Sequence, residues 1–143
     1  MYKNKLFIII GLSFYITMVI FLSTSGTTFA QQCRVVNLVN MGKSNSIKIE
    51  PETLLVSKGD CVVWFNIAGS EGVKIIFKDA KKCEENTQAP RGFSKDATGC
   101  YVADWIPFSG TSSLTFMGKG NYEYVVVARG MEDKKVKGYI KLE

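Results

Sequence analysis

Hydrophobic and polar residues follow two different patterns along the chain. Residues 6–22 form an almost continuous apolar run, with Lys3 and Lys5 before it and the polar stretch Ser23–Thr28 after it, ending in Phe29-Ala30. A basic start, an apolar centre and small residues before a cleavage point are the order of a secretory signal peptide. We therefore expect residues 1–30 to be a signal peptide that is cleaved between Ala30 and Gln31.

A retained N-terminal membrane anchor is the alternative, because about twenty apolar residues span a bilayer. Either way, residues 31–143 are predicted to lie outside the cytoplasm, in the periplasm or secreted. That length is enough for one domain built around a single core.

The second pattern begins after residue 30, where short runs rich in Val, Ile, Tyr and Phe alternate with clusters of Gly, Asn, Asp and Ser. This alternation is typical of an antiparallel all-β domain. The predicted strands are Arg34–Asn40, Ser46–Glu50, Leu54–Val56, Cys61–Asn66, Val73–Phe77, Ser112–Phe116, Asn121–Ala128 and Val136–Leu142. The run Cys61–Asn66 is so apolar that it predicts a central strand buried on both faces, with Trp64 in the core.

The stretch Lys78–Gly110 is polar and irregular, which predicts a loop or a short helix between the middle strands. No segment after residue 30 has convincing helical periodicity. The stretch Arg129–Lys135 is predicted to be a turn.

All four cysteines lie after the signal, which in an oxidising compartment predicts two disulfides. Four cysteines allow three connectivities, and the sequence selects none of them. We favour Cys83 with Cys100, which closes the irregular stretch, and Cys33 with Cys61, which joins the starts of two strands. No C-x-x-C motif is present, which argues against a zinc or haem site.

Charge and composition exclude several function classes. The chain has 18 basic and 13 acidic residues, and removal of Lys3 and Lys5 leaves 16 and 13, a net charge near +3. This is too mild to indicate nucleic-acid binding. The chain has no histidine, which removes the Ser-His-Asp and Cys-His arrangements and the commonest general base. We therefore expect a protein that is not an enzyme.

Two stretches carry a recognisable pattern. In Ile49–Asn66 (IEPETLLVSKGDCVVWFN), a strand with a proline reaches a Gly-Asp turn and then a V-x-W-x-N strand. In Leu114–Ile140, a hairpin of the form F-x-x-x-G-x-Y-x-Y leads to a final G-x-I strand. Together they resemble the opening and the ending of the cupredoxins, the blue-copper proteins. The resemblance implies a Greek-key β-sandwich of seven to eight strands.

The resemblance also implies where copper ligands would lie. A type 1 copper site uses two histidines and a cysteine thiolate, and an axial methionine is common. Counted from the aromatic residues of the matching strands, the first histidine position is Val73, the cysteine position is Val126 and the second histidine position is Arg129. Met131 is the one position that retains a possible ligand. Because an arginine stays protonated and repels a cation, we expect no bound metal and no cofactor.

We therefore expect a cupredoxin-like protein that has lost type 1 copper and serves as a non-catalytic binding or assembly module. By resemblance, its protein partner belongs to an extracytoplasmic electron-transfer complex. It contacts a membrane only if the N-terminal segment is retained. The alternative function is electron transfer with copper held by non-standard ligands.

The segment Gly99–Phe108 has two interpretations. Its side chains Tyr101, Trp105 and Phe108 form either a packed flap over the sandwich or an exposed partner surface, since tryptophan and tyrosine are preferred interface anchors.

Overall fold

The computed structural model describes residues 32–40, 46–69 and 72–143. The predicted signal peptide, its cleavage site and the alternative anchor lie outside the described residues. Within the described residues, no helix has the length and apolar character needed to cross a membrane.

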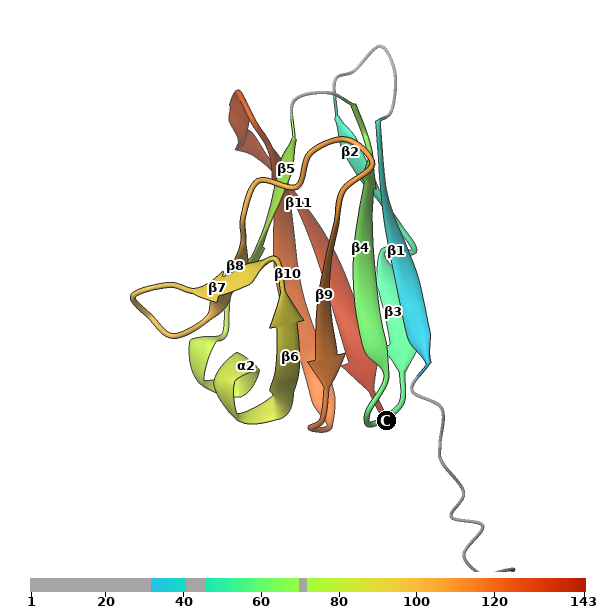
Figure 1. The fold of residues 1–143 in the computed structure, drawn as a ribbon, viewed down its shortest axis with the longest axis vertical. Coiled ribbons are helices and arrows are strands. Elements are labelled where there is room, and N and C mark those ends of the chain that lie inside the picture. Colours follow the sequence, from blue (N-terminus) through green and yellow to red (C-terminus); the bar gives the residue numbers. More distant parts are fainter. Residues whose placement is uncertain (1–31, 41–45, 70–71) are drawn as a thin grey trace, which may run out of the picture. The chain divides into compact units, whose positions relative to one another are not determined.

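The domain is a sandwich of two β-sheets (Figure 1). The five-stranded sheet has the order β2 (Ile47–Glu50), β1 (Cys33–Asn40), β4 (Cys61–Ile67), β9 (Thr111–Phe116) and β6 (Thr87–Arg91). The six-stranded sheet has the order β3 (Thr53–Val56), β11 (Met131–Leu142), β10 (Gly120–Ala128), β5 (Val73–Phe77), β8 (Tyr101–Ala103) and β7 (Phe93–Lys95).

The core lies between the two sheets and is centred on aromatic rings. Trp64 of β4 is fully buried and packs edge-on against Phe77 of β5 and Tyr124 of β10, with ring centroids 5.7 and 5.5 Å apart. These three residues come from both sheets, so the cluster ties the two layers together. The prediction that Trp64 is a core residue is confirmed.

All eight predicted strands and the predicted fold class are confirmed, and the stretch Lys78–Gly110 contains a short helix, one of the two possibilities predicted for it: the seven-residue α2 (Ala80–Asn86). Three details were wrong. The first is that no strand was predicted in this stretch, which also contains the short strands β6, β7 and β8. The helix begins after Asp79, whose Oδ1 accepts a hydrogen bond from the Lys82 backbone N–H at 3.0 Å. Two turns of helix are too short to show a periodic apolar face.

The second wrong detail is the turn predicted at Arg129–Lys135. It spans only Arg129-Gly130, because β11 begins at Met131 and pairs with Ala128 of β10. The charged residues from Glu132 to Lys135 are exposed positions of a strand. Four consecutive charged residues at an exposed strand end resemble a turn when only composition is considered.

The third wrong detail concerns β4, which is central in its sheet but is not buried on both faces. Val62 and Trp64 face the core, whereas Val63 and Phe65 on the opposite face are half-buried and Ile67 is exposed. The outer face of this sheet is therefore apolar without being covered.

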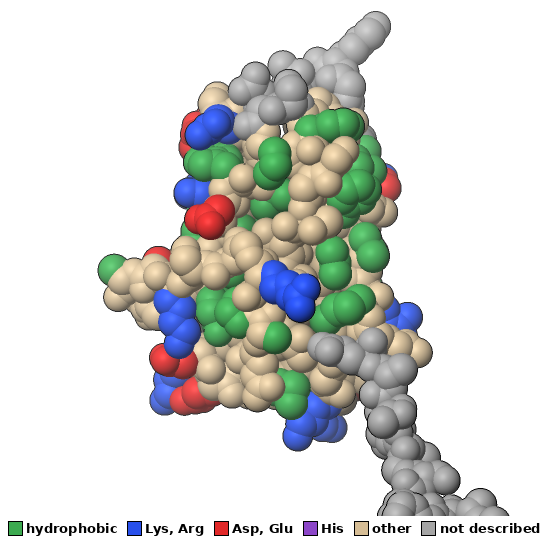
Figure 2. Space-filling view, in the orientation of Figure 1, with side chains coloured by type: hydrophobic (Ala, Val, Ile, Leu, Met, Phe, Trp, Pro, Cys, Tyr) green, Lys and Arg blue, Asp and Glu red, His purple; other side chains and the backbone are tan. Residues whose placement is uncertain are grey.

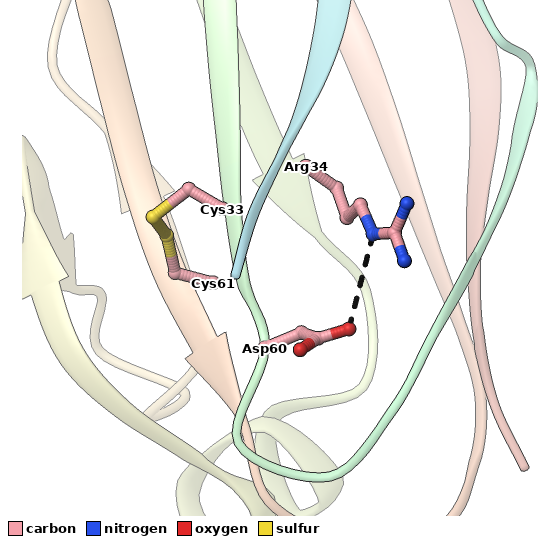
Figure 3. Close-up of a disulfide and its surroundings, with 4 residues drawn as sticks. All are labelled: Cys33, Arg34, Asp60 and Cys61. Atoms are coloured by element: carbon pink, nitrogen blue, oxygen red, sulfur yellow. Dashed lines mark ion pairs between the residues drawn. A yellow bond between two sulfur atoms is a disulfide. The ribbon is translucent and has the colours of Figure 1, made fainter. Parts of the chain in front are cut away.

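The predicted bridge between Cys33 and Cys61 is present (Figure 3). It joins the starts of the parallel neighbours β1 and β4, with the two Cα atoms 4.5 Å apart. Arg34 Nε and Asp60 Oδ2 form an ion pair at 4.0 Å beside it, and Asp60 also accepts the Ser57 backbone N–H at 3.0 Å. The start of β1 is thus held to β4 by a covalent bond and a charge pair.

Candidate functional site

Three of the four positions that the resemblance assigns to copper ligands lie around one residue, Ala128. Val73 of β5 and Met131 of β11 both pair with Ala128, and Val126 lies two residues earlier on the same face of β10. Val73 and Val126 are buried, and Met131 packs partly buried against the core. Hydrophobic side chains therefore fill this end of the sandwich.

The stretch from Val126 to Met131, to which the resemblance assigns three of the four ligands, is a closed hairpin. β10 continues to Ala128, a two-residue turn follows, and β11 pairs back onto β10. A β-bulge between Val126 and Ala128 is the only irregularity in this pairing. The backbone here makes a compact turn and not a loop that presents side chains to an ion.

Arg129, the fourth position, does not point into this cluster. Its guanidinium carbon lies 5.3 Å from the centroid of the Trp105 ring, and Lys74 Nζ lies 4.8 Å from the same centroid. A cation within about 6 Å of an aromatic ring is attracted by the ring's quadrupole. Arg129 therefore belongs to an outer cation–π cluster with Trp105 and Lys74.

Trp105 is held in place by the segment Asp104–Phe108, which we call the strap. Ile106 and Val73 exchange two backbone hydrogen bonds, of 3.0 and 2.8 Å. The buried Asn66 side chain donates from Nδ2 to the Ile106 carbonyl at 2.9 Å, while its Oδ1 accepts the Ala68 N–H at 2.9 Å. The strap is thus fixed to both sheets at this end of the domain.

The structure separates the three residues that were predicted as a possible partner surface. Tyr101 is 6% exposed and packs against Phe93, so a surface that includes it does not form. Trp105 is half-buried in the cation–π cluster, and Phe108 is 56% exposed. Both interpretations of the segment hold in part, because its start is packed and its end is accessible.

Cys83 of α2 and Cys100, which precedes β8, lie together in the core as thiols. Their Sγ atoms are 3.1 Å apart and both residues are 1% exposed. Burial raises the pKa of both thiols above its ordinary value. The predicted disulfide between them stays a prediction, with the two sulfurs already in contact.

The donor atoms present do not fit a type 1 copper site. Among residues 32–40, 46–69 and 72–143, no three His, Cys, Asp or Glu side chains are grouped as metal ligands. Met117 and Met131 lie beyond opposite ends of the nine-residue strand β10, roughly 30 Å apart at about 3.3 Å per residue. A soft-metal site built from thioethers that uses both methionines is therefore excluded by geometry.

An open groove of about 690 Å³ lies between β2 and β11, away from the Val73 and Val126 cluster. Charged side chains dominate its rim, and Lys48 and Glu50 pair there at 2.6 Å. Lys137, also on the rim, pairs with Glu123 at 3.2 Å. Of the carboxylates that line the groove, that of Glu50 is thus paired with a lysine in an open setting.

No family model matches the sequence, and no curated protein matches it. Solved structures of amicyanin do match its fold. The reduced Cu(I) form at pH 4 of one amicyanin mutant is 21% identical, with a TM-score of 0.51 over 81% of this chain and 87% of that chain. A second mutant, also in the Cu(I) form, is 20% identical with a TM-score of 0.52, and a reduced third mutant is 19% identical with a TM-score of 0.52, at the same coverage.

Proposed function

We propose that this chain, whose fold is that of the cupredoxins, is an extracytoplasmic, metal-free binding module that acts without catalysis. Its working surface is the end of the sandwich where β5, β10, β11 and the strap meet. The observation that carries the proposal is the replacement of the copper-ligand positions by the buried side chains of Val73 and Val126 inside a closed hairpin.

The chemistry of these side chains supports the loss of metal. Valine has no donor atom, and two buried valines beside Met131 leave a single thioether, which is a weak axial ligand in such sites. Arg129, at the position that the resemblance assigns to the second histidine, carries a guanidinium, which repels cations. Apolar packing thus takes over the role that metal coordination has in copper-binding proteins of this fold.

Export is supported by the Cys33–Cys61 disulfide, since such bonds form and persist in oxidising compartments. The leader-like pattern of residues 1–30 is consistent with it.

The accessible residues of this end favour a protein partner. Tryptophan and arginine are enriched among residues that dominate binding energy at interfaces, and here Trp105 and Arg129 lie together with the exposed Phe108 on the adjoining strap. The partner is proposed to be a protein of an extracytoplasmic electron-transfer complex, on the strength of the fold alone.

Copper binding by the exported protein tests the proposal. The purified protein is incubated with Cu(I) and with Cu(II), desalted, and analysed for retained copper and for a visible charge-transfer band. We expect no retained copper and no band. About one copper per chain with such a band would overturn the proposal and establish a copper electron carrier with non-standard ligands.

A matched variant shows whether any retained copper is bound by the buried cysteine pair. The double substitution Cys83→Ser and Cys100→Ser removes the only two thiols among the described residues. If copper bound to the wild type is lost in this variant, the buried cysteine pair is the ligand source. If copper remains, the ligands lie elsewhere.

A further inference from the structure

The outer face of the five-stranded sheet is apolar at its centre. Directly paired residues share a face, so the registers between β1 and β4 define rows across this surface. The rows are the Cys33–Cys61 disulfide, Val35 beside Val63, Asn37 beside Phe65, and Val39 beside Ile67. Val35 is 49% exposed and Ile67 is 38% exposed, while Val63, Phe65 and Val39 are partly buried.

This composition is unusual for a sheet face that meets water. A sheet face that meets water normally carries polar residues that alternate with the buried ones. Here the alternate positions of β1 and β4 are mostly valine, isoleucine and phenylalanine. The hydrophobic side chains gather over β4 and β1 in Figure 2, which looks onto the same side as Figure 1, where this sheet lies in front. We call Val35, Val39, Val63, Phe65 and Ile67 the outer patch.

Polar residues border the outer patch on both sides. β9 contributes Thr111 and Ser113 next to Phe65 and Val63. Beyond β9, Arg91 of β6 pairs with Ser113. On the opposite border, Lys48 and Glu50 of β2 pair with Val39 and Asn37. An apolar centre with a polar rim is the anatomy of a protein interface.

We propose that the outer patch is the contact surface of a homodimer, in which two copies pack this sheet face to face. The two-fold axis runs along the strands near β4, so β4 lies against β4 of the partner subunit and each β6 lies against the other copy's β2. This inference does not rest on the proposed function, which concerns the end of the sandwich near Val73.

Charge selects a second copy as the occupant. The exported residues 31–143 carry a formal net charge near +3, so self-association through a basic face is opposed by repulsion. The outer patch has no charge at its centre. The two-fold arrangement places Arg91 toward the Lys48–Glu50 ion pair of the partner subunit, where Glu50 attracts the guanidinium and the pair as a whole carries no net charge. An interface with two-fold symmetry has to be complementary to itself, and the neutral centre and these borders satisfy this condition.

The size of the face is also adequate. Five strands spaced about 4.8 Å apart, with about six residues each on average rising about 3.3 Å, span roughly 24 by 20 Å. The flat area of roughly 480 Å² underestimates the accessible surface of side chains that stand out from the sheet. Stable interfaces bury about 800 Å² on each partner, which is comparable once that relief is included.

The test is the mass of the purified exported protein in solution. Sedimentation velocity and light scattering after gel filtration are carried out between about 1 and 200 µM protein at physiological salt. We expect a concentration-dependent dimer. A monomer over the whole range overturns the proposal, whether or not the same protein binds phospholipid vesicles or another protein.

Variants locate the contact. Phe65→Lys and Val35→Lys each place a charge in the outer patch and are expected to raise the dimer dissociation constant at least tenfold. Leu55→Lys is the matched control, because Leu55 is 58% exposed on β3 of the other sheet. Circular dichroism shows which variants are folded, and Val35 is exposed enough to accept lysine without disturbing the core. A dimer that survives both substitutions in folded protein refutes this interface.

A charge reversal tests the orientation. Arg91→Glu is expected to weaken the dimer by placing a negative charge near Glu50 of the partner subunit, and Arg91→Glu combined with Glu50→Arg is expected to restore it. Failure of the double variant to restore affinity excludes the proposed two-fold axis.

Discussion

At the scale of single residues, the resemblance motifs can be explained by contacts. The asparagine that ends the V-x-W-x-N pattern is Asn66, which holds the strap through the Ile106 carbonyl. The glycine of the final G-x-I pattern is Gly138, where an added Cβ would lie 2.3 Å from Cζ of Tyr124. One residue anchors an irregular segment and the other leaves room for a core aromatic ring.

Replacement of Asn66 by alanine is predicted to destabilise the protein by about 1–3 kcal/mol, because the Ala68 N–H loses its buried acceptor and the strap loses a donor. Urea unfolding measures the loss. Hydrogen exchange is expected to accelerate at the Ile106 amide, which bonds Val73. Asn37→Ala on the outer face of β1 is the control, and an equal loss there would contradict the assigned role.

Replacement of Gly138 by alanine is predicted to cost about 1–3 kcal/mol, as overpacking in a filled core does. The Tyr124 ring cannot move away easily, because Trp64 and Phe77 pack against it with centroids 5.5 Å distant. Thermal unfolding compares this variant with Lys137→Ala, an exposed neighbour on the same strand. Similar melting temperatures for the two variants would show that the ring adapts.

At the scale of secondary-structure elements, the sequence predicts a strand best where buried and exposed residues alternate regularly along it. Most of the eight predicted strands were predictable because apolar residues at alternate positions face the core. The strands β6 to β8 were missed, and the short helix was predicted only as one possibility and without bounds, because these elements are held by particular contacts, such as the Asp79 cap and the pairing of Phe93 with Ala103. A cap aspartate before Lys81 and Lys82 was an available signal, but two turns of helix give no periodicity to support it.

The contact between α2 and the residue before β8 gives a prediction at this scale. Exported protein is expected to contain no free thiols, because Cys83 and Cys100 have sulfurs 3.1 Å apart in an oxidising compartment. A bond between residues 17 positions apart is expected to stabilise the fold by about 3 kcal/mol. Thiol titration in denaturant, before and after reduction, should give zero and then four thiols.

Two thiols in the unreduced sample would contradict this disulfide. The double variant Cys83→Ser and Cys100→Ser should unfold at lower denaturant, with the Cys33–Cys61 bridge intact. If the pair is instead reduced in the folded protein, alkylation should be slow at neutral pH, because burial raises the pKa of both thiols and lowers the thiolate fraction.

At the scale of the whole molecule, the sequence predicted the sandwich but not its surfaces. The outer patch could not be predicted, because a strand such as Cys61–Ile67, apolar at nearly every position, suggests burial on both faces. Only the sheet order shows that no element of the described chain covers the outer side of β4. The association of Arg129 with Trp105 was equally hidden, since it depends on how the strap crosses β5.

Stability at high pH is a property of the whole fold that one core group is predicted to control. Burial raises the pKa of Tyr124 from 10.0 to about 12. The folded state therefore keeps the phenol neutral where the unfolded chain ionises it. The stabilisation that the neutral Tyr124 phenol contributes is fully present below pH 10 and is lost as the pH rises from 10 to 12. The free energy of unfolding falls by up to about 3 kcal/mol over this range.

Tyr124→Phe isolates this effect, because it keeps the ring that packs against Trp64 and Phe77 and removes the ionising hydroxyl. Lysine ion pairs such as Lys78–Glu123 weaken in the same pH range in both proteins, so their loss cancels in the comparison. Unfolding free energies measured by urea titration from pH 8 to 12 should diverge above pH 10, with the phenylalanine variant the more stable. Parallel curves would show that Tyr124 ionises in the folded state as readily as in the unfolded chain, and that its hydroxyl reaches solvent.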